Sequence, residues 1–281
     1  MVPPVVDLSW VWARWDEVVL ADVRWYLDGR PGRAMYERGH LPGAVFVDLD
    51  RWLAGAPGAS GGRHPLPDPE VFAAGMSSLG IGDATTVVGY DDAGGVVAAR
   101  LVWLLRVTGH PAALLDGGLA AFGGPLETAT PEVGPARFTP RPWPPQRLAT
   151  IEDATDPAKV VLDARSPERY RGEEEPVDPR AGHIPGARSL PCRANLDADG
   201  SLLPVATLRR RFDAAGVAGD ASVVSYCGSG VTACHTLVLL EHCGFEGGRL
   251  YPGSWSEYSR APDRPAATGD PGAPGSMAGD G

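Results

Sequence analysis

The sequence contains very little cysteine and almost no lysine. Four cysteines in 281 residues are too few for a scaffold held together by disulfides, so each cysteine is expected to be a free thiol in a reducing compartment. Lys159 is the only lysine, and acidic residues outnumber basic ones by 35 to 25. The resulting net charge of −10 argues against a basic surface for binding nucleic acid, and we expect no nucleic-acid partner.

Long hydrophobic runs are also missing. No segment approaches the roughly 18 consecutive apolar residues of a transmembrane helix, so no membrane partner is expected. The first residues, MVPPVVDLSWVWARWDE, lack the basic region and the cleavage site of a secretory signal, which favours a cytoplasmic location. With 43% hydrophobic and 21% charged residues, the composition is that of a globular protein, and the length suits two domains of about 100–150 residues.

The most informative feature is an internal repeat. The segment GHLPGA at 39–44 recurs as GHIPGA at 182–187, and the triplet DVR at 22–24 recurs as DAR at 163–165. An apolar run at 87–90 likewise recurs at 223–226. The order of the segments is kept and their spacing drifts only slowly, as loop insertions would cause. The chain is therefore predicted to be a tandem duplication of one domain.

The domain boundaries follow from two stretches of unusual composition. Six prolines between 131 and 147 are incompatible with a helix or a central strand and indicate an extended, semi-rigid linker. Apolar periodicity is lost after about residue 260, which predicts a disordered tail. We expect a first domain at 1–130, a linker at 131–149, a second domain at 150–260 and a tail at 261–281.

Each copy alternates short apolar runs with amphipathic segments of helical length. Residues 160–162 and 222–226 have the composition of buried strands, and 231–243 has helical spacing with Gly244 at its C-terminal end. Such alternation predicts an α/β fold in which a parallel sheet is flanked by helices in each copy. Ligands of such folds bind at the carboxyl ends of the strands.

One loop at such a strand end carries a cysteine. The strand at 222–226 leads into Cys227-Gly228-Ser229-Gly230-Val231-Thr232, and the predicted helix follows directly. Two glycines let backbone N–H groups point inward, and together with the helix N-terminus they form an anion site. A thiol held there is activated as a nucleophile.

The motif Cys-Gly-Ser-Gly-Val-Thr-Ala-Cys-His at 227–235 resembles the active-site loop of 3-mercaptopyruvate sulfurtransferases, in the two-domain rhodanese superfamily. Both Gly-His-x-Pro-Gly-Ala segments, Leu115–Gly118 and Gly253–Glu257 also resemble landmarks of this family, in family order. The resemblance implies a doubled rhodanese-like domain of which only the second copy is catalytic. Asp91 stands in the first copy where Cys227 stands in the second, in agreement with a non-catalytic first copy.

The resemblance also implies a reaction. Cys227 would take the sulfur of 3-mercaptopyruvate as a persulfide, release pyruvate and pass the sulfur to an acceptor such as thioredoxin, another thiol or cyanide. The loop amides at Gly228, Gly230, Val231 and Thr232 would hold the anionic sulfur.

The resemblance further implies two groups of site residues outside the loop amides. Arg169 falls where the family places an arginine for the substrate carboxylate; Arg180 is the match for a second one, with Arg171 as its competitor. The matches for a Ser-His-Asp proton relay are Ser229, His64 and Asp50, the last two reaching across from the first copy.

The residues of the loop support other functions less well. A cysteine phosphatase needs an arginine at the end of its loop, where this chain has Ala233. A metal site at Cys227, Cys234, His235 and Cys243 would spread around a helix, so no metal and no cofactor are expected. A thiosulfate sulfurtransferase and a non-catalytic persulfide carrier remain as alternatives. Thiosulfate-using relatives usually carry basic residues after the cysteine, and Gly228 and Ser229 here favour 3-mercaptopyruvate.

Overall fold

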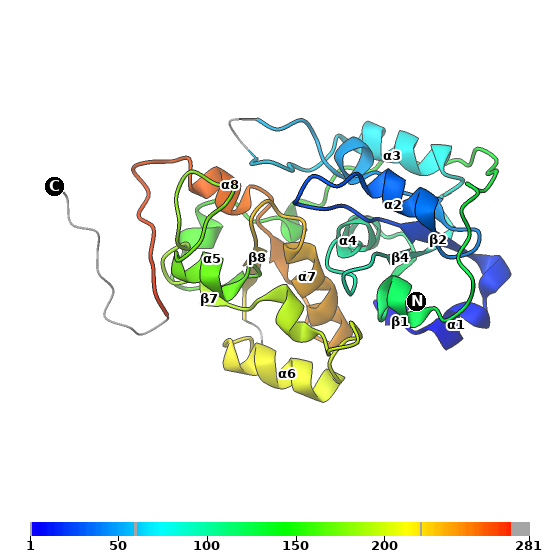
Figure 1. Ribbon diagram of the computed structural model, residues 1–281. Helices are drawn as coiled ribbons and strands as arrows, with labels where there is room; N and C mark the ends of the chain where they lie inside the picture. Colours follow the sequence, from blue (N-terminus) through cyan, green and yellow to red (C-terminus); the bar gives the residue numbers. More distant parts are fainter. Residues whose placement is uncertain (1, 59–60, 220, 271–281) are drawn as a thin grey trace.

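Each half of the chain folds around its own parallel β-sheet (Figure 1). The computed structural model describes residues 2–58, 61–219 and 221–270. The first sheet has the order β1-β5-β4-β2-β3 and the second the order β7-β6-β8-β9, with parallel pairing throughout. The strands are β1 (Val5–Val6), β2 (Val18–Asp22), β3 (Val45–Phe46), β4 (Thr86–Tyr90), β5 (Ala112–Leu115), β6 (Val160–Asp163), β7 (Arg188–Ser189), β8 (Val223–Tyr226) and β9 (Arg249–Leu250).

Helices flank both sheets, which confirms the predicted α/β architecture. The predicted strands match β6 and β8, and the predicted helix at 231–243 matches α7 within two residues at its start. The α-helices are α1 (Leu8–Trp12), α2 (Gly32–Arg38), α3 (Pro69–Ser78), α4 (Ala99–Val107), α5 (Pro167–Arg171), α6 (Val205–Ala214), α7 (Ala233–His242) and α8 (Ser254–Tyr258). Short 3-10 helices lie at Trp15–Glu17, Gly118–Ala121, Pro145–Arg147, Asp153–Thr155 and Cys192–Asn195, and a π-helical turn at Leu49–Leu53. None of the described helices has the length and apolar character needed to cross a bilayer.

The two copies repeat one set of buried polar contacts. In each, an aspartate at the end of a strand pairs with an arginine two residues later, and a tyrosine ring stacks on the histidine of the Gly-His-x-Pro-Gly-Ala segment. The pairs are Asp22–Arg24 and Tyr36–His40 in the first copy, and Asp163–Arg165 and Tyr170–His183 in the second. Each histidine also bonds through Nδ1 to the carbonyl of the tyrosine on which it stacks. The repeated motifs therefore build the same framework twice, as the duplication predicts.

The domains meet through two helices that begin after the corresponding strand-end loops. Helix α4 packs against α7 between the two sheets (Figure 1), and Arg106 of α4 forms an ion pair with Glu241 of α7. Buried side chains of both copies belong to one continuous apolar cluster, which contains Leu101 of α4 and Leu237 of α7. Because apolar burial is continuous across the interface, the two strand-end loops are held at a fixed separation.

The proline-rich segment is extended and packs along the first domain. The Ala136 N–H donates to the Ser77 carbonyl (3.1 Å), the Phe138 ring packs on Phe72, and Trp143 Nε1 donates to the Pro67 carbonyl (2.8 Å). The chain then enters the second sheet through a parallel pairing of Leu148 with Leu250. This pairing occupies the position that β1 holds in the first sheet.

The expected disordered tail is wrong for residues 261–270. Ala267 pairs with His183 in an antiparallel bridge, and Tyr258 Oη donates to the Pro265 carbonyl (2.7 Å). These residues lack apolar periodicity because backbone hydrogen bonds, rather than apolar side chains, attach them to the second domain. The expectation for 271–281 lies outside the described residues.

Candidate active site

The loop after β8 directs a backbone N–H at the cysteine sulfur. Cys227 follows the last residue of β8, and its side chain is 2% exposed. The Gly230 N–H donates to Cys227 Sγ (3.1 Å), and the Cys227 N–H donates to Ser254 Oγ (3.2 Å). Gly230 has φ +80°, and a Cβ there would lie 2.7 Å from the Pro252 carbonyl, so the turn requires glycine. An N–H directed at the sulfur stabilises negative charge on it.

The equivalent loop of the first copy contains its own anion. The Asp91 carboxylate accepts hydrogen bonds of 2.7–2.9 Å from four backbone N–H groups, those of Ala93, Gly95, Val97 and Ala98. Asp91 is 1% exposed. The strand-end loop of this fold therefore binds a negative charge, and in the first copy the position is already filled by a side chain.

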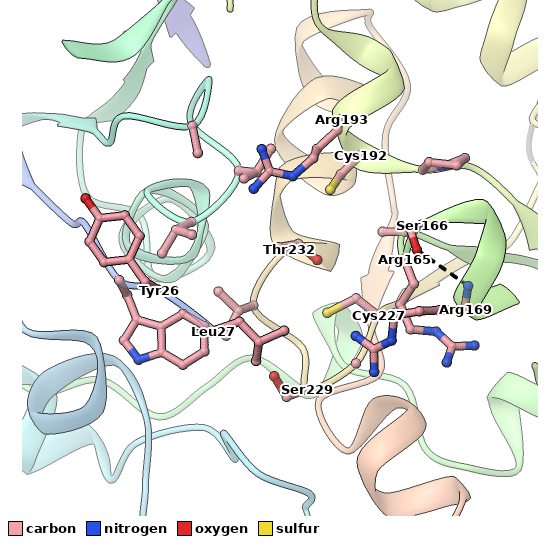
Figure 2. A pocket seen from close by; sticks show the side chains of 18 of the residues that line it. Tyr26, Leu27, Arg165, Ser166, Arg169, Cys192, Arg193, Cys227, Ser229 and Thr232 are labelled. Atoms are coloured by element: carbon pink, nitrogen blue, oxygen red, sulfur yellow. Dashed lines mark hydrogen bonds between the residues drawn. The ribbon is translucent and has the colours of Figure 1, made fainter. Parts of the chain in front are cut away.

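A cavity of about 760 Å³ lies between the two domains in front of Cys227. Figure 2 shows Cys227, Ser229 and Thr232 on one side, with Tyr26 and Leu27 of the first domain facing them. Of the loop residues expected at the site, Gly228, Ser229, Val231 and Thr232 line the cavity together with Cys227. Gly230 does not line the cavity, and its N–H donates to Cys227 Sγ.

Two arginines flank the loop at Gly228. A Cβ built on Gly228 would lie 3.0 Å from Arg63 Nη2 and 3.4 Å from Arg169 Nη1. Arg169 donates from Nε (3.2 Å) and Nη2 (2.6 Å) to the Glu175 carboxylate. Asp178, with a side chain 2% exposed, accepts from Arg63 on one oxygen and from Arg169 on the other. The positive charge missing from the loop sequence is thus supplied by two other segments.

The structure does not bring Arg180 into the cavity. Its guanidinium donates to the backbone carbonyls of Tyr258, Ser259, Ala261 and Arg264, and it does not line the cavity. The competitor Arg171 pairs with Glu173 and is likewise outside the cavity lining. Arg180 holds the segment after α8 in place, which corrects the expectation that it binds substrate.

Sequence reasoning missed further residues that line the cavity. Arg63 brings a guanidinium group to it. Arg193 brings another, and the 6% exposed Cys192 brings a second thiol (Figure 2). Arg63 immediately precedes His64, which the family resemblance had identified, so a basic residue at the next position could have been predicted to lie near the site. Arg193 lies in a short 3-10 helix after β7, for which the sequence contained no recognisable motif.

Ser229, His64 and Asp50 are brought together across the domain interface. His64 Nδ1 lies 2.7 Å from Ser229 Oγ, and His64 Nε2 lies 3.5 Å from Asp50 Oδ1. The indole N–H of Trp25 donates to Asp50 Oδ2 (3.1 Å). Burial lowers the pKa of His64 to about 4, although the Asp50 carboxylate acts in the opposite direction. The imidazole is therefore neutral at pH 7 and able to exchange a proton with the Ser229 hydroxyl.

Comparison with known proteins identifies the family. The family model of the rhodanese-like domain matches residues 7–124 and 145–261. The chain belongs to the rhodanese-like family and contains two copies of its domain, which confirms the resemblance found in the sequence.

Relatives named as sulfurtransferases match most of the chain. A protein named "Probable 3-mercaptopyruvate sulfurtransferase" from Pseudomonas aeruginosa is 44% identical over 270 residues, which cover 90% of this chain and 93% of the relative. The thiosulfate/3-mercaptopyruvate sulfurtransferase 1 of Arabidopsis thaliana is 33% identical, covering 93% and 77%. The solved structure of 3-mercaptopyruvate sulfurtransferase from Leishmania major superposes with a TM-score of 0.81 at 32% identity, covering 92% of this chain and 76% of that one.

The four cysteines should differ sharply in reactivity. Burial raises the pKa of Cys192 and Cys234 to about 12 and that of Cys243 to about 11, so at pH 7 about one part in 10,000 or less is thiolate. We expect iodoacetamide to alkylate Cys227 alone in the folded protein at neutral pH. Peptide mass mapping measures this, with urea-unfolded protein, in which all four react, as the control. Labelling of Cys192 as fast as Cys227 would contradict the prediction.

The low pKa of His64 predicts a pH-dependent stability. Between pH 6.5 and about 4 the unfolded chain binds a proton at this imidazole and the folded protein does not, so the folded state loses stability as the pH falls through this window. His64→Gln lacks this titration and keeps all others. The difference in free energy of unfolding between wild type and His64→Gln should shrink by about 2–3 kcal/mol from pH 7 to pH 4. Urea titrations at both values measure it, and a constant difference would refute it.

Proposed function

We propose that this protein is a sulfurtransferase that moves sulfane sulfur from 3-mercaptopyruvate to a thiol acceptor through a persulfide on Cys227. The observation that carries the proposal is the Gly230 N–H on Cys227 Sγ at the floor of a cavity, next to the Arg63 and Arg169 guanidiniums. A nucleophilic sulfur and a carboxylate-binding group are the two features that this donor requires. Relatives that carry this activity in their names match most of the chain.

In the proposed reaction the cysteine loop binds the transferred sulfur and Ser229 moves a proton. The Cys227 thiolate attacks the donor sulfur, the carbon–sulfur bond breaks, and its electron pair stays on the carbon as the enolate of pyruvate. The thiol proton of the donor must move to that carbon, and the Ser229 hydroxyl with neutral His64 behind it provides a path. The loop amides then face the persulfide anion, as those of the first copy face Asp91. An acceptor thiol attacks the outer sulfur and restores the Cys227 thiolate.

The first copy is proposed to be non-catalytic. Its strand-end loop carries a carboxylate where the second carries a thiol, and that carboxylate occupies the backbone donors. The proposal includes a protein thiol such as thioredoxin as acceptor and a cytoplasmic location, where a reducing environment returns thiols to their free form. All four cysteines are free thiols in the described structure.

Thiosulfate is the second candidate donor. The sequence favoured 3-mercaptopyruvate because basic residues are missing after Cys227, but Arg63 and Arg169 supply positive charge at the same place from other segments. The Arabidopsis thaliana relative is named for both donors. In the remaining alternative, a non-catalytic persulfide carrier, Cys227 would form a persulfide but the protein would not catalyse transfer of its sulfur to an acceptor.

The reaction is tested by assaying both donors on one preparation. We expect pyruvate release from 3-mercaptopyruvate to exceed sulfite release from thiosulfate, and Cys227→Ser to abolish both, because a serine hydroxyl is not ionised at pH 7 and stores no sulfane sulfur. Cys243→Ala, a buried thiol outside the cavity lining, is the control and should retain activity. A wild-type persulfide that forms but is not discharged by thiols would support the carrier instead.

Arg169 is predicted to bind the donor carboxylate. Arg169→Ala should raise the KM for 3-mercaptopyruvate about 10- to 150-fold, which corresponds to a charge-assisted contact of roughly 1.5–3 kcal/mol. Arg169→Lys should recover only part of this, since an ammonium lacks the planar fork of a guanidinium. Initial-rate kinetics with a thermal-unfolding check measure the effect. A KM at the wild-type value in Arg169→Ala would exclude this role.

A further inference from the structure

Arg193 lies at the same edge of the second sheet as the cysteine loop. It belongs to the 3-10 helix that follows β7, and the order β7-β6-β8 puts one strand between this helix and the loop after β8. Ala164, which follows β6, connects the two: its N–H donates to the Tyr226 carbonyl (2.9 Å), and its carbonyl accepts from the Cys192 N–H (3.1 Å). The sheet itself therefore sets the position of the Arg193 backbone relative to Cys227.

Arg193 differs from the other arginines of the cavity in having no carboxylate partner. Five arginines line the cavity, and four of them form ion pairs, namely Arg30 with Asp28, Arg63 with Asp178, Arg165 with Asp163 and Arg169 with Glu175. Within residues 2–58, 61–219 and 221–270, the Arg193 side chain makes neither an ion pair nor a hydrogen bond. It therefore brings to the cavity a positive charge that no carboxylate of these residues offsets.

Arg193 and Arg169 approach the nucleophile from different sides. Figure 2 shows Arg193 with Cys192 on one side of Thr232, and Arg169 beside Cys227 on the other. Burial raises the pKa of the Cys192 thiol, Cys227 acts in the same direction and Arg193 in the opposite one, so both residues lie within electrostatic range of this thiol. A ligand with its sulfur at Cys227 can thus extend a negative group toward Arg193, away from Arg169.

The cavity is larger than the proposed donor needs. Its volume is about 760 Å³, which lies in the range of pockets that hold ligands of drug size. The non-hydrogen atoms of 3-mercaptopyruvate fill roughly 200 Å³, at about the 30 Å³ that one water occupies in the liquid. Because pyruvate leaves before the acceptor thiol attacks, the same cavity then receives a second molecule, and it has room for a larger one.

We propose that Arg193 binds the carboxylate of the sulfur acceptor and makes this cavity selective for anionic thiols of low molecular weight. The inference rests on the proposed function, because it requires a persulfide on Cys227. In the step concerned, the acceptor thiolate attacks the outer sulfur of the protonated persulfide and forms a new sulfur–sulfur bond. The bond between that sulfur and Cys227 Sγ breaks, its electron pair stays on Sγ as the thiolate, and the transferred sulfur leaves on the acceptor with its proton. Arg193 determines specificity and takes no part in the bonds that change.

The test measures how fast matched thiols discharge the persulfide. Protein loaded with 3-mercaptopyruvate is freed of small molecules and mixed with two pairs of thiols of equal length. The pairs are 3-mercaptopropionate with 3-mercapto-1-propanol, and 6-mercaptohexanoate with 6-mercapto-1-hexanol, and cyanolysis counts the persulfide that remains. With wild type, the carboxylate should react about tenfold faster than its alcohol at one of the two lengths or both.

The variants assign this preference to one residue. Arg193→Met should reduce the ratio of the two rates to about one, by slowing the carboxylate and leaving the alcohol within about twofold, and Arg193→Lys should keep part of it. The KM for 3-mercaptopyruvate, with 2-mercaptoethanol as acceptor, should stay within about twofold in Arg193→Met. Arg210→Met is the control: it removes the same charge from an exposed position on α6 outside the cavity lining, and it should keep the wild-type ratio.

Three results would overturn the proposal: equal rates within both pairs in wild type, an unchanged ratio in Arg193→Met, or a donor KM that rises as much as the discharge rate falls. Arg193→Gln decides the same question if Arg193→Met unfolds. Wild type that releases no pyruvate from 3-mercaptopyruvate would instead refute the proposed function. The persulfide is then loaded from thiosulfate, and the same ratio decides the role of Arg193. Protein that neither donor loads would overturn both.

Discussion

A single buried guanidinium holds the parts of the active site together. Arg100 of α4 is completely buried, and among the described residues it forms no ion pair with a carboxylate. It donates instead to the carbonyls of Leu53 (3.2 Å), His64 (3.2 Å), Pro65 (3.3 Å) and Gly230 (3.0 Å). The four carbonyls lie in three segments, around Leu53, at His64–Pro65 and at Gly230. Because a buried charge with unsatisfied donors costs several kcal/mol, these segments must keep their carbonyls within hydrogen-bonding distance of the guanidinium. Two belong to the first domain and one to the catalytic loop.

The contacts at the cavity depend on this arrangement. The hydrogen bond from Arg100 to the His64 carbonyl fixes the backbone of His64, whose imidazole reaches Ser229. Arg63, the residue before His64, is one of the two arginines beside Gly228. The Gly230 carbonyl bound by Arg100 belongs to the same peptide turn whose N–H meets Cys227 Sγ. The interface between domains thus sets where His64 and Ser229 lie relative to Cys227 Sγ, and the proposed proton path depends on it.

The two copies share a framework and differ at one position, the residue that follows β4 in the first copy and β8 in the second. The paired aspartate and arginine and the stacked tyrosine and histidine recur with nearly equal distances in both halves. At the strand end the copies differ: Asp91 fills its own loop, whereas Cys227 leaves a cavity in front of its sulfur. Repeats predicted the duplicated framework, strand–helix alternation predicted the α/β class, and the strand-end position with its glycines predicted the cysteine loop, because each depends on a local pattern. The family resemblance, rather than the repeats, pointed to Ser229 and His64, which lie within hydrogen-bonding distance of one another.

Two expectations failed because they needed knowledge of distant partners. The resemblance matched Arg180 to a second substrate arginine near Arg169, but its guanidinium donates to the carbonyls of Ala261 and Arg264, which follow α8. Residues 261–270 were expected to be disordered on composition, yet those same carbonyls and the pairing of Ala267 with His183 hold them. The two errors have one cause, since the arginine and the segment are each other's partners. A linear motif search finds neither.

The charges that line the cavity are not divided by sign between its walls. Arg63 and Arg169 lie beside Gly228, and Arg193 adds another guanidinium to the lining. On the side of the first domain the Asp92 carboxylate accepts from Tyr26 Oη (2.5 Å), and the Arg30 guanidinium stacks on the Tyr26 ring at 4.0 Å. Because guanidinium groups lie on both sides, an anionic ligand is attracted to the cavity without a preference for one wall. The position of Cys227 Sγ, which accepts from the Gly230 N–H, then sets which end of the proposed donor reacts.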